Sequence, residues 1–181
     1  MTDKKALRAA LRARRDVFAA DVGVAIPVDP AFPALLVPGM TVASYVPIGG
    51  EADPAPLERA ALDRGCRLAL PQVIDRATPL RFALHDPGAP LVPGPFGLRQ
   101  PPAYAPEAAP DVVLTPLVGF DRALNRIGQG AGHYDRAFAA FPDARRIGIA
   151  WSVQEIDAIQ PDPWDVPLHA IATEREWIVR A

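Results

Sequence analysis

Near its start, the chain carries an apolar stripe of helical period. Four apolar residues recur at three-to-four-residue spacing and predict an amphipathic helix over residues 3 to about 20. They are Leu7, Ala10, Leu11 and Phe18. Four cations lie along the edge of this stripe: Lys4, Arg8, Arg12 and Arg15. A basic row at the edge of a buried face can lean over a cleft, whereas the alternative is an ordinary solvated face.

Short β-rich runs then alternate with helical ones. After a mostly irregular stretch over residues 21–39, strands are expected over residues 41–46, 67–70, 80–84, 111–117 and 146–151, and helices over residues 54–64 and after residue 132. Several of these strands are continuously apolar, which is typical of parallel strands covered on both faces. The sequence therefore predicts one α/β domain over residues 1–181, with an open, mostly parallel sheet and helices on both faces in a Rossmann-like, three-layer arrangement. Prolines break residues 86–110, where we expect no regular structure. The segment is either a surface excursion near the site or a long inert loop.

Composition excludes several function classes. The 181 residues carry 19 basic and 21 acidic side chains, a net charge of −2 that gives no overall footprint for nucleic acid or an anionic membrane. No apolar run reaches the length of a membrane span or forms a signal peptide. The lone Cys66 excludes an internal disulfide and is expected to be buried in a reducing cytosol. We expect a cytoplasmic monomer that binds small molecules, with no nucleic-acid or membrane partner.

Three alternating glycines, Gly128, Gly130 and Gly132, lead into the helix expected after residue 132. Residues without a Cβ reach positive φ and can present successive N–H groups to an anion, and a following helix adds its positive dipole end. Arg126 adds a fork of donors, and Asp135 can reach a metal that neutralises phosphates. The alternative is a plain strand-to-helix turn capped by Asp135. The spacing excludes both the GxxxxGK[ST] loop and the GxGxxG dinucleotide fingerprint.

The whole stretch LTPLVGFDRALNRIGQGAGHYDRAF resembles the signature of the 5-formyltetrahydrofolate cyclo-ligase family, P-x-x-A-F-D-x-x-G-x-R-L-G-x-G-x-G-Y-Y-D. The residues in register are Pro116, Phe120, Asp121, Arg126, Gly128, Gly130, Gly132, Tyr134 and Asp135. Near the start, KKALR is similar to the family's K-x-x-L-R, and SYVPIGGEADP resembles its segment after the first strand.

The resemblance implies an ATP-dependent conversion of 5-formyltetrahydrofolate to 5,10-methenyltetrahydrofolate, with ADP and phosphate as further products. ATP and Mg²⁺ are the cofactors it implies. It gives a catalytic role to Arg126, Lys4 and Arg8. The nucleotide-binding residues it implies are Lys4, Lys5, Arg8, Arg126, Ile127, Gly128, Gln129, Gly130, Ala131, Gly132, His133 and Tyr134. Those for the folate substrate are Val46, Glu51, Gln129, Gly130, Gly132 and His133, and Asp135 is the metal ligand.

Physical chemistry supports these roles in part. Lys4 and Arg8 lie one helical turn apart, so both cations can face one triphosphate. A carboxylate at Glu51 suits the N–H donors of a reduced pterin, although without the resemblance it could equally end a Gly-Gly turn in solvent.

Five residues depart from the family pattern. Leu124 replaces a glycine, Gln72 an arginine and Gln100 a glutamate. His133 replaces the first tyrosine of Tyr-Tyr-Asp, and a histidine beside phosphates is expected to favour its charged form. His169 stands where the family has an aspartate associated with magnesium, and imidazole is a poor Mg²⁺ ligand, so a surface or helix-end role is the alternative. Two other functions stay open: a divergent folate or nucleotide binder with little turnover, and a different ATP-dependent enzyme.

Overall fold

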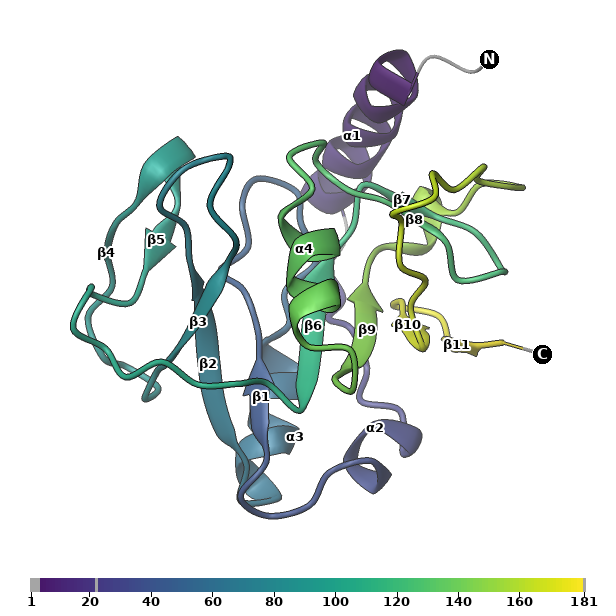
Figure 1. Cartoon of the computed structure of the whole chain (residues 1–181). Coiled ribbons are helices and arrows are strands. Elements are labelled where there is room, and N and C mark those ends of the chain that lie inside the picture. Colours follow the sequence, from purple (N-terminus) through teal and green to yellow (C-terminus); the bar gives the residue numbers. More distant parts are fainter. Residues whose placement is uncertain (1–3, 22, 181) are drawn as a thin grey trace.

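The computed structural model describes residues 4–21 and 23–180 and is built around one seven-stranded sheet (Figure 1). The strand order is β11-β10-β9-β6-β1-β2-β3. The strands are β1 (Thr41–Ala43), β2 (Arg67–Gln72), β3 (Arg81–Leu84), β6 (Val112–Pro116), β9 (Arg145–Ile149), β10 (Ala170–Ala172) and β11 (Trp177–Val179). The five inner strands run parallel, and the edge strands β3 and β11 are antiparallel to their neighbours.

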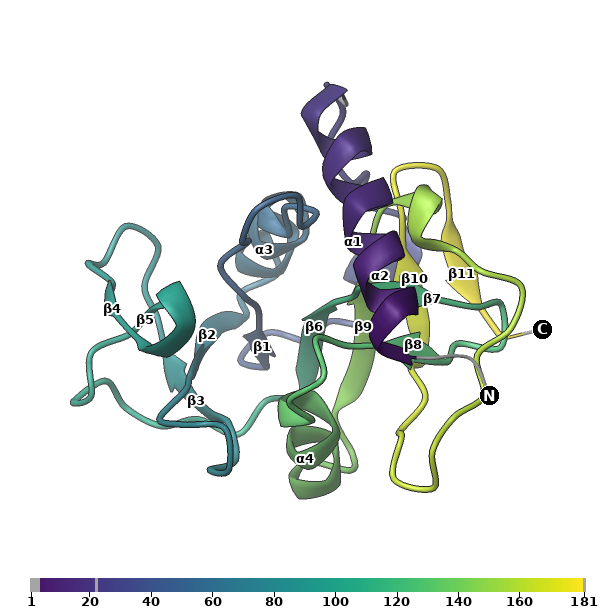
Figure 2. The same cartoon turned by 90° about the horizontal axis from the view of Figure 1, so that it is seen from above.

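Helices cover both faces of the sheet, as Figure 2 shows. Helices α1 (Lys4–Asp21), α2 (Ala31–Ala34) and α3 (Ala55–Asp63) lie on one side, and α4 (His133–Ala140) lies on the other. Consecutive strand residues point to opposite faces, so Val42 packs with Phe32 and Leu57 in one core cluster, while Ala43 packs with Phe138 in a second. The predicted three-layer α/β architecture is confirmed.

The N-terminal helix lies where the apolar period predicts it. Leu11 is buried, Leu7 and Phe18 pack against core clusters, and only Ala10 of the predicted stripe is exposed. Cys66 is buried in the core, as expected.

Elsewhere several sequence-based elements and boundaries differ from the structure. Residues 86–110 contain a short hairpin, β4 (Val92–Pro93) and β5 (Arg99–Gln100), around the one-turn 3-10 helix η1 (Pro95–Gly97). Such a hairpin tolerates prolines because few of its N–H groups enter a ladder. Strand β1 ends three residues earlier than predicted, and the short strands β10 and β11 were not predicted.

A second hairpin follows β6 and positions the glycine loop. It pairs β7 (Gly119–Phe120) with β8 (Arg126–Ile127), and a buried aspartate fixes its turn. The Asp121 carboxylate accepts the backbone N–H groups of Asn125 at 2.9 Å and Ile159 at 2.8 Å. Leu124, at the position where the family has glycine, has a φ of +66° and is buried in the core. Burial of its side chain offsets a left-handed backbone that costs about 1–2 kcal/mol.

Candidate active site

A cavity of about 640 Å³ opens at the carboxyl ends of the central strands. Pro116, which ends β6, lines it together with Tyr45 and Val46, which follow β1. The N-terminal half of α1, the glycine loop and the start of α4 supply further walls. Ligands of open α/β sheets bind at this edge, outside the carboxyl ends of parallel strands.

Nearly all of the residues expected from the sequence lie around this one cavity. The expected residues in its lining are Lys4, Arg8, Val46, Glu51, Arg126, Ile127, Gly128, Gln129, Gly130, Ala131, Gly132, His133, Tyr134 and Asp135. Lys5 lies on the same helix but is not among the lining residues. Tyr45, Asp162 and Asp165 also line the cavity, although sequence reasoning gave them no site role. Arg15, which the sequence placed in the basic row but in no ligand set, lines it as well.

Two of the three alternating glycines have the positive φ that the sequence predicts, and Gly128 does not. Gly130 has a φ of +102° and Gly132 a φ of +68°, and Gly132 is the N-cap residue of α4. The Arg8 guanidinium donates through Nε to the carbonyl oxygen of Gly128 at 3.0 Å, so a hydrogen bond connects α1 to the loop. Helix α4 has no side-chain cap at its N-cap residue, and the Asp135 carboxylate pairs with Arg126, so the expected Asp135 cap is not seen. Whether the loop binds phosphate or is only a turn stays a question for the Gly130 variant.

Arg126 is almost fully buried at the base of the loop. Its side chain is 6% exposed, forms an ion pair with Asp135 and stacks over the Phe138 ring, with 5.0 Å from Cζ to the ring centroid. Burial lowers the pKa of the guanidinium, while Asp135 opposes that shift. Its Nε is buried and has no hydrogen-bond partner among the described residues. An orphaned charged donor beside an amide-rich loop suits an incoming anion.

Lys4 approaches the same cavity from the first turn of α1. Its Nζ lies 2.5 Å from Asp162 Oδ2 and 3.7 Å from Asp165 Oδ2. Two of the expected phosphate-binding cations, Lys4 and Arg126, are thus paired with carboxylates. A bound phosphate must exchange with these carboxylates or share the cations with them.

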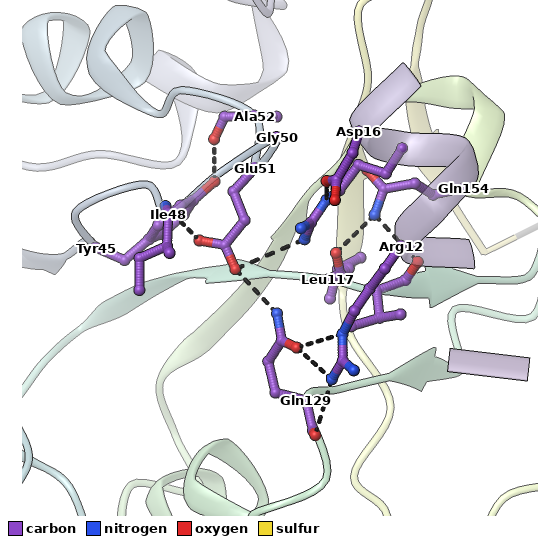
Figure 3. A network of polar contacts seen from close by, with 12 residues as sticks. Arg12, Asp16, Tyr45, Ile48, Gly50, Glu51, Ala52, Leu117, Gln129 and Gln154 are labelled. Carbon is purple, nitrogen blue, oxygen red and sulfur yellow. Dashed lines mark hydrogen bonds and ion pairs between the residues drawn. The ribbon is translucent and has the colours of Figure 1, made fainter. Parts of the chain in front are cut away.

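Glu51 is buried on the other side of the cavity, in the network of Figure 3. Its Oε2 accepts the Ile48 backbone N–H at 3.0 Å, and its Oε1 accepts Gln129 Nε2 at 3.1 Å. Arg12 donates to Gln129 Oε1 from Nε at 3.0 Å and from Nη2 at 2.7 Å. Burial raises the pKa of Glu51. The alternative that Glu51 is a solvent-exposed turn carboxylate is wrong. Gln129, which belongs to the glycine loop, connects that loop to the Glu51 carboxylate by a hydrogen bond.

The two unusual histidines have different surroundings. His133 lines the cavity, and its Nδ1 lies 3.2 Å from Arg136 Nη2. Burial, then Arg136, lowers its pKa, so the surrounding protein groups favour the neutral imidazole. The charged form expected beside phosphate stays a prediction. His169 is not among the cavity residues: it precedes β10 at the opposite edge of the sheet, where Nδ1 accepts the Arg146 backbone N–H at 3.0 Å. It serves the alternative, structural role.

The lowered pKa of His133 leads to a measurable expectation. In the ligand-free protein its imidazole should titrate below the ordinary value of about 6.5 and be neutral at pH 7. A pH titration of the histidine ring signals by NMR, assigned with a His133→Tyr variant, measures this pKa. A value above that of free histidine would show that the surrounding arginines do not govern this side chain.

The cavity fits a nucleotide better than it fits a resident metal ion. It combines the orphaned Arg126 donor with a glycine loop at a helix N-terminus. Within residues 4–21 and 23–180, by contrast, no group of three or more histidine, cysteine or acidic side chains could hold a metal. Asp135 supplies one carboxylate, which matches Mg²⁺ only where phosphate oxygens and water complete its shell.

Comparison with known proteins agrees with this geometry. A profile of the 5-formyltetrahydrofolate cyclo-ligase family matches residues 1–174. The chain belongs to the 5-formyltetrahydrofolate cyclo-ligase family. The 5-formyltetrahydrofolate cyclo-ligase of Mycolicibacterium smegmatis is 35% identical over 154 residues, covering 80% of this chain and 79% of that one. That of Escherichia coli K12 is 31% identical over 140 residues, covering 74% and 77%.

Two solved structures share the fold. The 5,10-methenyltetrahydrofolate synthetase of Aquifex aeolicus superposes with a TM-score of 0.70 at 26% identity, covering 97% of this chain and 92% of that one. The synthetase of Mycoplasma pneumoniae gives 0.66 at 28% identity, covering 94% and 98%.

Two departures from the cyclo-ligase family pattern have structural roles here. Gln72 donates through Nε2 to the carbonyl oxygens of Pro101 at 3.2 Å and Pro102 at 2.8 Å. Gln100 Oε1 accepts the Val73 backbone N–H at 3.0 Å. Both amides tie the β4–β5 hairpin to the end of β2, beside the cavity.

Proposed function

We propose that this chain cyclises 5-formyltetrahydrofolate to 5,10-methenyltetrahydrofolate with ATP, releasing ADP and phosphate. The observation that carries the proposal is one cavity with two chemically distinct walls. A cationic glycine-loop wall lies beside a wall with a buried carboxylate, and Gln129 contacts both. The names of the relatives match this reaction.

The cationic wall binds the ATP phosphates. Lys4, Arg8 and Arg126 supply the charge, and the loop from Ile127 to Gly132 supplies backbone N–H groups at the start of α4. His133 and Tyr134 continue this wall into the helix. Within residues 4–21 and 23–180, no helix has the length and apolar character needed to cross a membrane.

The carboxylate wall binds the folate. Glu51 accepts N–H groups of the reduced pterin, which presents several donors on one edge, and Val46 contacts the ring. Gln129, Gly130, Gly132 and His133 face both ligands and bring the formyl group toward the terminal phosphate.

The reaction needs positioning and charge neutralisation more than covalent help. The formyl oxygen attacks the γ-phosphorus, and the bond between that phosphorus and the β,γ-bridging oxygen breaks to release ADP. N10 then attacks the formyl carbon and loses its proton, and the carbon–oxygen bond breaks to release phosphate with the former formyl oxygen. Arg126, Lys4 and Arg8 stabilise the charge on the transferring group, so no side-chain nucleophile is required.

We expect Mg²⁺ to bind together with the nucleotide. Mg²⁺ neutralises phosphate charge, and Asp135 is the residue we assign to hold it, together with phosphate oxygens and water. We also propose that residues 1–181 act as one domain and as a monomer, because one chain supplies every group that the reaction needs. The same proposal places the protein in the cytoplasm, where reducing conditions suit the lone Cys66.

Purified protein mixed with ATP, Mg²⁺ and 5-formyltetrahydrofolate tests the proposal. We expect near-ultraviolet absorbance from methenyltetrahydrofolate to rise, with one ADP formed per product molecule. Binding of both ligands without turnover would favour the divergent binder, and ATP hydrolysis without a folate product would favour a different ATP-dependent enzyme.

A further inference from the structure

A buried guanidinium lies behind the carboxylate that we assign to the pterin. The Arg15 side chain is 7% exposed, although its place in the basic row predicted an edge position. Its Nε donates to Asp16 Oδ1 at 2.9 Å. Its Nη1 is buried, has no hydrogen-bond partner among the described residues and lies 3.9 Å from Glu51 Oε1. An unpartnered buried charge of this kind calls for a functional explanation.

Arg15 and Glu51 are complementary in charge and matched in burial. The Glu51 side chain is also 7% exposed. The distance of 3.9 Å is too long for a hydrogen bond, so the contact acts through charge and leaves the carboxylate lone pairs open to other donors. An opposite charge at this range favours the ionised carboxyl group, which burial disfavours.

The Ile48 N–H is the strongest influence favouring the ionised Glu51, and the Arg15 guanidinium comes next. The Gln129 amide and the Ile48 N–H stabilise the carboxylate as neutral donors, and Asp16 opposes its ionisation. Burial, and then Glu51, raises the pKa of Tyr45 and of Tyr134, so both stay neutral hydroxyls at working pH. Arg12 reaches Glu51 only through Gln129. In the described part of the chain, Arg15 is the one residue whose cationic group lies within 4 Å of a Glu51 carboxylate oxygen.

We propose that Arg15 is a positioning residue for folate binding, whose buried guanidinium keeps Glu51 a carboxylate that is ready to accept the pterin N–H groups. This inference rests on the proposed function, because it takes 5-formyltetrahydrofolate as the ligand of Glu51. It adds a role on helix α1, separate from the phosphate-binding role of Lys4 and Arg8 on the same helix.

The test is the pH dependence of 5-formyltetrahydrofolate binding without ATP, measured by calorimetry in unaltered, Arg15→Met and Arg15→Lys proteins. Binding is lost as pH falls through the pKa of Glu51, since the protonated form cannot accept two N–H groups. Removing the cation raises that pKa further. The low-pH fall in 5-formyltetrahydrofolate affinity, called here the acid limb, should therefore move up by about 1 pH unit or more in Arg15→Met. Arg15→Lys should bring the limb back toward its original position. Well above the limb, the Met variant should bind within about threefold of the unaltered protein.

A purely structural role would give another result. Equal weakening of binding at every pH, or a limb that does not move in Arg15→Met, would overturn the inference. If Arg15→Met does not fold, Arg15→Gln must show the same shift, because it keeps polar donors without the charge. Absence of 5-formyltetrahydrofolate binding by the unaltered protein would overturn the proposed function and this inference with it, whereas normal binding with an unmoved limb would overturn only the inference.

Discussion

Arg126→Ala should lower turnover by at least about tenfold and weaken ATP binding. The substitution removes a charged fork at the base of the glycine loop, where the guanidinium is buried against Asp135 and Phe138. Charged hydrogen bonds of this kind contribute about 1.5–3 kcal/mol each, and tenfold in rate corresponds to about 1.4 kcal/mol. Steady-state kinetics with the ATP concentration varied, together with calorimetric binding of ATP, measure both effects.

Arg146→Ala is the matched control for this change. Arg146 also lies over the Phe138 ring, with 5.8 Å from Cζ to the centroid, but it is outside the cavity. It should therefore reproduce the loss of ring packing without the loss of ATP affinity. A folded Arg126→Ala protein with unchanged rate and unchanged ATP affinity would remove this arginine from the site.

Gly130→Val should abolish nucleotide binding while the protein stays folded. The φ of +102° is a conformation that a β-branched residue rarely adopts, so the loop must rearrange. An added Cβ would also lie 3.5 Å from Arg8 Cζ, on the side where phosphate is expected to meet the guanidinium. Calorimetry with ATP and thermal unfolding of the same sample separate the effect on binding from the effect on stability.

Gly88→Val gives the corresponding control, because Gly88 has a φ of +85° in an exposed turn with no atom within 4 Å of an added Cβ. Both variants should lower the melting temperature to a similar extent, since both force a similar backbone strain. Only the Gly130 variant should lose ATP. Normal ATP affinity in Gly130→Val would show that the loop is merely a turn.

The sequence predicts the site best where the chemistry is local. Alternating glycines before a helix determine a backbone conformation on their own, so Gly130 and Gly132 adopt the positive φ values expected of them. The row of cations on α1 follows from helical period alone, and Lys4 and Arg8 line the cavity as predicted.

Long-range packing decided what the sequence could not predict. Whether Arg15 meets solvent or the core depends on how α1 rotates against the segment that carries Glu51, which no local pattern encodes. Asp162 reaches Lys4 across 158 positions of the chain, and the lowered pKa of His133 comes from burial and from arginines around the folded cavity. At Leu124 the structure explains a feature of the family sequence pattern. The positive φ of this residue is the reason that the family prefers glycine at that position.

Transfer of the formyl oxygen to phosphate is the most direct test of the central claim, that one cavity joins ATP to the formyl group. Single-turnover reactions would use 5-formyltetrahydrofolate labelled with ¹⁸O in the formyl group, together with unlabelled ATP and Mg²⁺, and mass spectrometry would measure the released phosphate. The account predicts one ¹⁸O atom in each phosphate released with methenyltetrahydrofolate. Methenyltetrahydrofolate formed with unlabelled phosphate would contradict it, because the formyl oxygen would then have left without being phosphorylated.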